Sequence, residues 1–254
     1  MLAHQREEAI LGRLREIGSV SAQELVRLLD VSAPTVRRDL ERLEGEGLLR
    51  RVHGGALSTQ EASGGDEAPF GAVTAEFAPE KDAIAVAAAA LVEDGQVVLL
   101  DIGTTTARIA RQLRGRAVTV ITSSLAVLDE LRNDEAVELV LLGGTVRRNF
   151  QTVVGPLTED AIASVSADLA FLSCTGVRAD GAIVDDISRE ASIKRAIAKS
   201  AGRLMLVATA AKFPGTGAIR IAQLEEMDAV ITTASADHAP LNDYAGNGGK
   251  VIAL

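Results

Sequence analysis

From about residue 80 onward, the sequence alternates short apolar runs with segments of helical periodicity, and this alternation restricts the fold more than any other feature. Buried strands separated by helices of about 10–15 residues are typical of parallel sheets. The pattern therefore predicts an α/β class domain, doubly wound and mostly parallel, over residues 80–254. The predicted strands are 97–101, 118–122, 137–142, 167–174, 204–209 and 229–232, and the predicted helices are 83–92, 105–113, 125–132, 158–164 and 190–201.

The beginning of the chain follows a different pattern, a run of short helices. Apolar residues recur at helical spacing over 10–17. Ser21 and Glu24 have the spacing of a capping box at the start of a second helix. Ser32 is expected to cap a third helix, which tolerates Pro34 in its first turn. Two short helices around a tight turn predict a helix-turn-helix.

A short strand and a linker are expected to follow these helices. Residues 48–52 are typical of a strand, and 53–55 of a turn or wing. Residues 58–79 lack periodicity and are rich in Ser, Gly, Ala and Pro, which indicates a linker. We therefore predict an N-terminal module over residues 1–57, a linker over 58–79 and the α/β domain after it.

The third predicted helix carries arginines opposite its apolar face. At about 100° per residue, its core face consists of Val36, Leu40 and Leu43. The opposite face holds Thr35 and Arg38, which are candidates for base edges because this helix enters the major groove N-terminus first. Basic side chains suited to phosphates, which position a protein without specifying sequence, are Arg42, Arg50, Arg51 and His53.

The charge distribution permits DNA binding although the chain is acidic. The chain has 26 Lys and Arg against 35 Asp and Glu, a net charge of −9, and such an excess usually argues against nucleic acid. Residues 1–56 contain nine arginines and nine acids, so the whole excess, 17 − 26 = −9, lies after residue 56. An aromatic content of 2% argues against a stacking surface for single strands. An alternative is a small interaction domain whose arginines pair with Asp39, Glu41, Glu44 and Glu46.

The stretch VSAQELVRLLDVSAPTVRRDLERLEGEGLLRRVHGGA resembles the winged helix-turn-helix of the DeoR family of bacterial transcription regulators. The VS…TVRRDL core and the closing HGGA carry the resemblance. It implies binding to double-stranded operator DNA. The implied DNA-contacting residues are Ser32, Thr35, Arg37 and Arg38 in the recognition helix, and Arg51 and His53 in the wing.

Small polar residues follow three of the predicted strands. Asp101-Ile-Gly-Thr-Thr-Thr106 follows a strand and opens a helix, where free N–H groups and hydroxyls make an anion site. An ordinary strand–turn–helix junction with a Thr cap explains the segment equally well. Thr122-Ser-Ser124 and Gly143-Gly144 end the next two strands, which fits a ligand site at the carboxyl edge of the sheet. The cationic candidates for a phosphate are Arg147, Lys194 and Lys212.

This half of the chain is also similar to the DeoR family, through about residue 235. EKDAIA, LDIGTTT, VITSSL, LLGGTVRR, the stretch 190–197 and the AKF at 211–213 match its effector domain. The resemblance implies a fold like that of ribose-phosphate and glucosamine-phosphate isomerases, and an effector that is a phosphorylated sugar or derivative. The implied lining is Asp101, Gly103, Thr104, Thr105, Thr106, Ser123, Ser124, Gly143, Gly144, Lys194 and Lys212.

The sequence departs from the family pattern in three places. Residues 208–213 read ATAAKF, so the acid and the hydroxyl that usually precede Lys212 are missing. Ile183 and Val184 stand where the family often has Thr. The linker lacks the arginine commonly found before Glu80. These departures put the contacts near Lys212 in doubt and indicate an unusual effector.

Three functions from different classes remain. The first is a transcriptional repressor of a carbohydrate operon, controlled by a phosphorylated sugar and acting as a homodimer or larger homo-oligomer. The second is a sugar-phosphate isomerase with a DNA-binding appendage, whose base would come from Asp180, Asp185, Asp186 or Glu190. The third is a DNA-bound structural protein without a ligand.

The remaining features predict no further chemistry. Cys174, the one cysteine, is expected to be a small buried residue in a reducing compartment. The three histidines are far apart in sequence, so neither a metal nor a cofactor is expected. The longest apolar run, 83–92, is too short to span a membrane, and the N-terminus is charged. A cytoplasmic location is expected.

Overall fold

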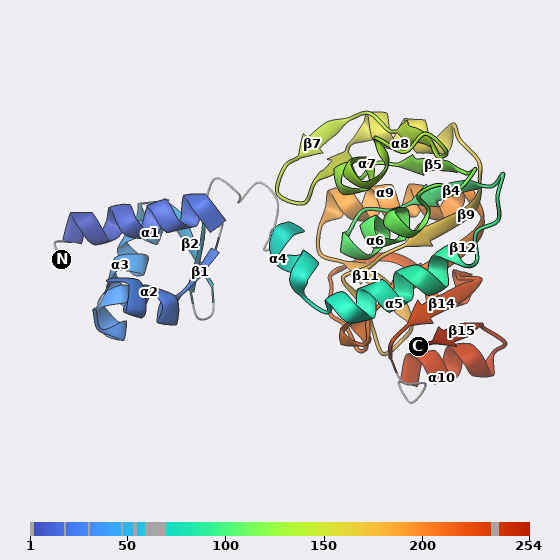
Figure 1. The fold of residues 1–254 in the computed structure, drawn as a ribbon. Coiled ribbons are helices and arrows are strands. Elements are labelled where there is room, and N and C mark those ends of the chain that lie inside the picture. The colour runs from blue at the N-terminus through green and yellow to red at the C-terminus, as the bar shows by residue number, and fades with distance from the viewer. Residues whose placement is uncertain are drawn as a thin grey trace. The chain divides into compact units, whose positions relative to one another are not determined.

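The computed structural model describes residues 3–17, 19–29, 31–46, 48–52, 55–58, 70–234 and 239–254. The chain folds into two compact units, an N-terminal unit of residues 1–72 and a C-terminal unit of residues 73–254 (Figure 1). Each unit has a hydrophobic core of its own.

The N-terminal unit is a winged helix-turn-helix. Its helices are α1 (Ala3–Ile17), α2 (Ala22–Leu29) and α3 (Ala33–Gly45). Its strands β1 (Ser19–Ser21), β2 (Leu49–Val52) and β3 (Gly55–Ser58) form an antiparallel sheet in the order β1-β3-β2. The core draws one apolar stripe from each helix, including Ile10, Leu14, Leu25, Leu29, Val36, Leu40 and Leu43. The helix-turn-helix prediction is therefore confirmed.

Helix α3 begins as predicted, with one difference at its cap. Ser32 occupies the N-cap position and Pro34 lies in the first turn. The Ser32 side chain makes no capping hydrogen bond to the backbone, because its Oγ lies 2.9 Å from Thr35 Oγ1 and pairs with that hydroxyl instead. The predicted capping bond is therefore wrong. The side chains of Ser21 and Glu24, the predicted capping box, lie outside the described residues.

The C-terminal unit is built on a seven-stranded sheet in which every neighbouring pair is parallel. Its order is β15-β14-β12-β9-β4-β5-β6. The strands are β4 (Val97–Leu100), β5 (Thr119–Thr122), β6 (Glu138–Leu141), β9 (Ala167–Leu172), β12 (Ala201–Ala208), β14 (Ala229–Thr232) and β15 (Val251–Ala253). The predicted doubly wound α/β class is confirmed.

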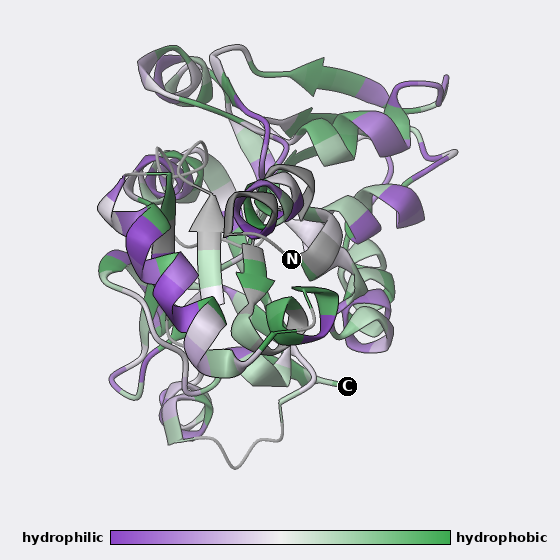
Figure 2. Ribbon diagram, turned by 90° about the vertical axis from the view of Figure 1, so that its left-hand side faces the viewer, coloured by the Kyte–Doolittle hydropathy of each residue, from purple (hydrophilic) through white to green (hydrophobic). Residues whose placement is uncertain are grey.

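Helices cover both faces of this sheet, which explains why its strands are apolar on both sides. One face packs against α5 (Ala78–Ala89), α6 (Thr104–Gln112) and α7 (Leu125–Leu131). The other packs against α8 (Pro156–Ala163), α9 (Ser188–Lys199) and α10 (Ala239–Gly246). Alternate residues of a strand therefore enter different cores, as Leu99 and Leu100 do. Figure 2 shows hydrophobic strands between helices that also carry hydrophilic residues.

The order of the strands creates one topological switch point in the sheet. From β4 the chain adds β5 and β6 on one side, and then returns to place β9 on the other side of β4. In open α/β sheets, ligands bind beyond the carboxyl ends of the strands at such a point. Asp101 follows β4 there, and Ser173 follows β9.

Several small elements were not predicted. They are the hairpin β7 (Thr145–Arg147) and β8 (Thr152–Val154), the sheet of β10 (Gly176–Val177), β11 (Ala182–Asp185) and β13 (Ile219–Gln223), the 3-10 turns at Ala210–Lys212 and Leu224–Glu226, and helix α4 (Phe70–Ala75). Strands β1, β3 and β15 and helix α10 were not predicted either. Helix α4 lies within the segment predicted to be a linker. The hairpin matters most for function, because it extends over the carboxyl edge of the sheet: Val153 N donates to Ser123 O at 2.8 Å.

Candidate DNA-contacting helix and candidate effector site

The outer face of α3 is exposed and its inner face is buried, as the periodicity predicts. Val36, Leu40 and Leu43 are at most 3% exposed. Arg37 and Arg38 are exposed, and Thr35 is half-buried. Within the part of the chain that the structure describes, Arg38 has no ion-pair partner. It is therefore a guanidinium available to an external acceptor.

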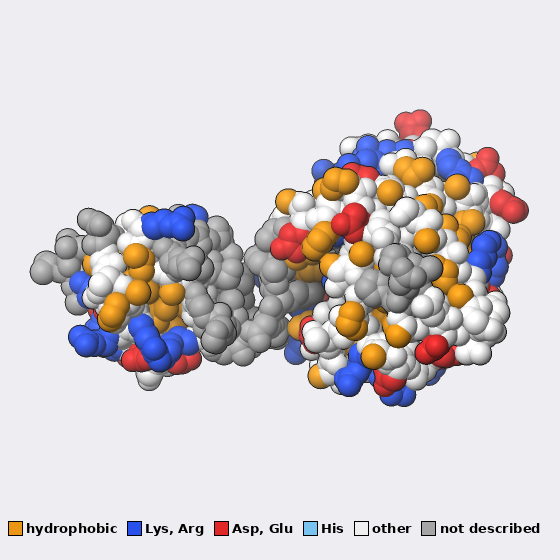
Figure 3. Space-filling view, turned by 90° about the horizontal axis from the view of Figure 1, so that it is seen from below, with side chains coloured by type: hydrophobic (Ala, Val, Ile, Leu, Met, Phe, Trp, Pro, Cys, Tyr) orange, Lys and Arg blue, Asp and Glu red, His pale blue; other side chains and the backbone are white. Residues whose placement is uncertain are grey.

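Three other arginines of the predicted DNA surface have carboxylate partners, and the side chain of Arg50 lies outside the described residues. Arg37 Nε lies 3.3 Å from Glu41 Oε1, and Arg42 pairs with Glu7. Arg51 lies 3.1 Å from Glu41 and 3.9 Å from Glu44. Figure 3 shows basic and acidic side chains next to one another on this unit. These pairs are partly those of the alternative interaction domain, but Asp39 pairs with Arg6 on α1 instead. His53 lies outside the described residues.

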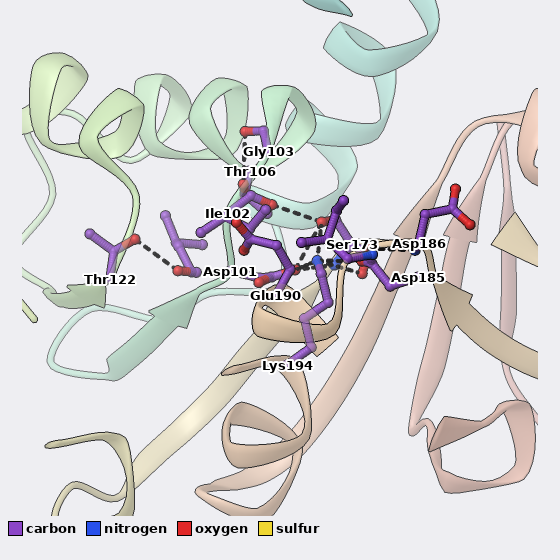
Figure 4. A network of polar contacts seen from close by, with 12 residues as sticks. Asp101, Ile102, Gly103, Thr106, Thr122, Ser173, Asp185, Asp186, Glu190 and Lys194 are labelled. Carbon is purple, nitrogen blue, oxygen red and sulfur yellow. Dashed lines mark hydrogen bonds and ion pairs between the residues drawn. The ribbon is translucent and has the colours of Figure 1, made fainter. Parts of the chain in front are cut away.

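Three side chains meet at the switch point (Figure 4). Lys194, on α9, forms an ion pair with Asp101 at the end of β4. Its Nζ also donates to Ser173 O at 3.1 Å and to Ser173 Oγ at 3.0 Å. The Ser173 backbone N–H donates to Asp101 Oδ2 at 2.9 Å. These contacts join β4 and β9 across the switch point.

Lys194 carries its charge although it is completely buried. Burial lowers the pKa of this ammonium, but the charges of Asp101 and Asp185 outweigh burial, so the pKa is raised above its ordinary value. Asp185 Oδ2, at the end of β11, lies 3.8 Å from Lys194 Nζ. Lys194 was one of three candidate phosphate ligands, but in the structure its ammonium is already paired with the carboxylates of Asp101 and Asp185.

Arg147 and Glu190 form a second buried pair at this edge. Arg147, on hairpin strand β7, donates to Glu190 in the first turn of α9, and the two side chains are 9% and 1% exposed. Burial raises the pKa of Glu190 to about 7, although Arg147 and Lys194 oppose the shift. Of the three cationic candidates, half-buried Lys212 has no carboxylate partner among the described residues.

The predicted phosphate loop lies directly beside this cluster. Gly103 precedes α6 with φ 125°, and a Cβ built there would lie 3.3 Å from Ser173 Oγ, so a glycine is needed. Thr106 Oγ1 donates to Gly103 O at 3.0 Å and closes the turn. Thr104 and Thr105 are buried, and no hydrogen bond engages either hydroxyl within the described chain. The N-terminal N–H groups of α6 open toward the same edge.

The other predicted lining residues divide into two kinds. Ser124 caps α7, because its Oγ accepts from Val127 N at 3.3 Å. Gly143 and Gly144 form a tight turn: Gly143 O accepts from Thr158, and a Cβ on Gly144 would lie 2.9 Å from Val154 O. These three contribute to the architecture of the edge. Ser123 is 1% exposed, and its Oγ has no hydrogen-bond partner in the described part of the chain.

The carboxylates considered for an isomerase occupy separate places. Asp185 and Glu190 lie near Lys194. Asp186 is exposed, and Asp180 is exposed in a turn, where it accepts from Ala182 N at 3.2 Å. Thr152, which the sequence did not single out, is brought to this edge by the hairpin. Glu190, considered only as an isomerase base, lies on α9 and pairs there with Arg147.

Other chemistry is limited in the described part of the chain. Cys174 is half-buried, and burial raises the pKa of its thiol to about 12, so the reactive thiolate is scarce. The described residues hold no group of three or more His, Cys, Asp and Glu side chains placed to bind a metal. No described helix is long and apolar enough to cross a membrane.

Comparison with known proteins identifies both units. Residues 6–62 match the DeoR-like helix-turn-helix domain, and residues 76–234 match the DeoR C-terminal sensor domain. The HTH-type transcriptional regulator GolR of Listeria innocua is 33% identical over 91% of both chains. The glycerol-3-phosphate regulon repressor of Haemophilus influenzae is 32% identical over 89% of this chain and 88% of its own length.

A solved structure matches part of the fold. The ribose 5-phosphate isomerase A of Methanocaldococcus jannaschii aligns over 52% of each chain with 20% identity and a TM-score of 0.38. The family matches cover most of the chain, and they join a DNA-binding domain to a sensor domain for a small molecule. The chain belongs to the DeoR family of DNA-binding transcriptional regulators.

Proposed function

We propose that this regulator represses a carbohydrate operon and that a phosphorylated sugar, bound at the switch point, changes its affinity for the operator. The observation that carries the proposal is the arrangement of polar groups at the carboxyl edge of the sensor sheet. There the N-terminus of α6 adjoins the buried Asp101–Lys194 pair, and no described residue hydrogen-bonds to the hydroxyls of Thr104 and Thr105. The name of the glycerol-3-phosphate regulon repressor supports control by a phosphorylated ligand.

On the DNA side, α3 reads bases and the wing contacts the backbone. Arg38 is the main base-reading residue because it is exposed and pairs with no carboxylate of the described residues. Thr35 lies about one helical turn before Arg38, and Ser32 is the N-cap of the same helix. Arg37, Arg42 and Arg51 contact phosphates, exchanging their present carboxylates for phosphate oxygens. His53 is proposed to contact the backbone with Arg51.

On the sensor side, the phosphate lies on the Gly103–Thr106 turn, where helix N–H groups point at it. Lys212 supplies the countercharge, since its ammonium has no carboxylate partner in the described chain. Lys194 stays with Asp101 and holds the carboxylate in place. Ser123 and Arg147 face the remainder of the ligand, while Ser124, Gly143 and Gly144 shape the edge.

The arrangement of the chain supports control of this type. We assign DNA binding to residues 1–57, a linker to 58–79 and sensing to 80–254. The active form is a homodimer or larger homo-oligomer, because a helix-turn-helix reads two half-sites about one DNA turn apart. The sensor holds its ligand without turnover. The names of the aligned relatives, which are regulators, support this assignment over an isomerase.

A thermal-shift screen of phosphorylated sugars tests the proposal. A ligand at about 100 times its Kd adds roughly 2.7 kcal/mol to the free energy of unfolding, a shift of several degrees for a domain of this size. Thr105→Ala should reduce the shift, whereas Ser166→Ala, an exposed serine before the amino end of β9, should leave it unchanged. A shift that persists undiminished in Thr105→Ala contradicts the phosphate assignment. No shift with any phosphorylated sugar contradicts the proposed function.

A further inference from the structure

Four buried oxygen atoms at the carboxyl edge of the sensor sheet have no hydrogen-bond partner among the described residues. They are Asp101 Oδ1, Ser123 Oγ, Thr152 Oγ1 and Glu190 Oε2, and their residues are at most 1% exposed. The described residues contain six such side-chain atoms in all, so four of the six gather in one region. Buried polar groups are almost always hydrogen-bonded, because leaving one unpaired costs free energy. A cluster of them indicates groups that await an external partner.

The hairpin β7–β8 brings these atoms to one place. Thr152 lies directly opposite Arg147 in the antiparallel register, so the two side chains are on the same face of the hairpin. Arg147 reaches Glu190 from that face. The negative charges of Asp101 and Glu190 both raise the pKa of Lys194, so both carboxylates lie near its ammonium. Ser123 joins the group through its backbone, which accepts a hydrogen bond from Val153, the residue after Thr152.

The chemistry of the four atoms specifies their partner. An ionised carboxylate accepts hydrogen bonds and donates none, while a hydroxyl does both. Above about pH 7, where Glu190 is ionised, a ligand carboxylate placed here would face two carboxylate oxygens that have no proton to donate. A ligand hydroxyl donates to a carboxylate and also accepts from Ser123 or Thr152. Neighbouring hydroxyls of a polyol satisfy all four atoms together.

We propose that Asp101, Ser123, Thr152 and Glu190 form a subsite that binds adjacent hydroxyls of the effector, and that Thr152 and Glu190 determine specificity. The inference rests on the proposed function, because it places the carbon chain of the ligand beside the phosphate at α6. The effector is then a phosphorylated sugar or alditol. The phosphorylated aldonic acid of the same carbon chain is excluded.

A pair of isosteric variants tests the role of Thr152. Thr152→Val removes an unsatisfied buried hydroxyl, so the unliganded protein should melt at the same or a higher temperature, while ligand affinity falls by about tenfold. Thr122→Val is the matched control. The Thr122 hydroxyl donates to Leu100 O at 2.9 Å and accepts from Ser124 N at 3.0 Å, so its loss should lower the melting temperature. Ser123→Ala gives a second variant with the signature expected of Thr152→Val.

Matched ligands test the chemical class. Titration calorimetry at about pH 8, above the pKa of Glu190, compares ribose phosphate, ribitol phosphate and phosphoribonate, and the glucose, sorbitol and gluconate phosphates in the same way. The sugar or alditol should bind at least about tenfold more tightly than the acid, and Thr152→Val should narrow that gap. An acid that binds as tightly as its alditol overturns the subsite and leaves the proposed function standing. Binding of none of the six overturns the proposed function, and the subsite with it. A Thr152→Val protein that melts lower and binds normally shows a structural hydroxyl.

Discussion

Replacing Lys194 by methionine should destabilise the sensor domain strongly, because it removes the positive charge from a buried acidic cluster. The Lys194 side chain is 2% exposed and lies among Asp101, Asp185 and Ser173. Methionine has a similar length and keeps the packing, so the change isolates the charge. The variant leaves Asp101 fully buried without its counterion. Breaking a buried pair in this way costs about 3–5 kcal/mol.

Urea unfolding near pH 7 measures this loss. The double variant Lys194→Met with Asp101→Asn should recover part of the loss, since it removes both charges. A loss below about 1 kcal/mol for Lys194→Met, or a double variant less stable than the sum of the singles, would refute the reasoning.

Three further predictions concern DNA, pH and the turn before the hairpin. Arg38→Ala should weaken binding to the operator far more than binding to random DNA, measured by electrophoretic mobility shift; equal losses would reduce Arg38 to a phosphate contact. Burial raises the pKa of Glu190 to about 7, so the folded state holds this proton more tightly than the unfolded chain does. The resulting contribution to the free energy of unfolding is complete below about pH 4.3 and is lost as the pH rises through about 7. In Glu190→Gln, the free energy of unfolding of the sensor domain should therefore lose a fall of about 3–4 kcal/mol over this window, and an unchanged pH profile would contradict the assignment. Gly144→Ala should cost about 1–3 kcal/mol in urea unfolding, because φ is 152° and Val154 O lies close; an unaffected midpoint would show that the turn adapts.

The strands of the sheet and the buried faces of the helices could be predicted because each follows from the spacing of apolar residues. Strands buried on both faces are continuous apolar runs, so 97–101 and 167–174 stood out in the sequence. Helix α4 was not predictable in this way. Its six residues have no apolar stripe, and side chains from later helices bind its end: Lys81 donates to Val73 O at 2.6 Å, and Arg108 to Thr74 O at 2.9 Å.

Site residues that directly follow a strand could be predicted from the sequence. Site residues that are placed by the pairing register of the hairpin β7–β8 could not. Asp101 ends an apolar run, and the chain after it reads as a helix start, so the edge of the sheet could be located. Thr152 carries no such signal. It reaches the site because a three-residue strand pairs it with Arg147, and only the fold shows that pairing. Arg147 and Glu190 are likewise 43 residues apart, so their pairing emerges from tertiary structure.

Ligand binding at the sensor edge is expected to change the affinity of the protein for operator DNA, and fluorescence anisotropy tests this most directly. A labelled operator, obtained by in vitro selection with the full chain, is titrated with the protein with and without the phosphorylated sugar that gave the largest thermal shift. Saturating ligand should change operator affinity by at least about fivefold, and operator DNA should change ligand affinity by the same factor. Operator affinity that stays constant while the ligand saturates the sensor would contradict the account.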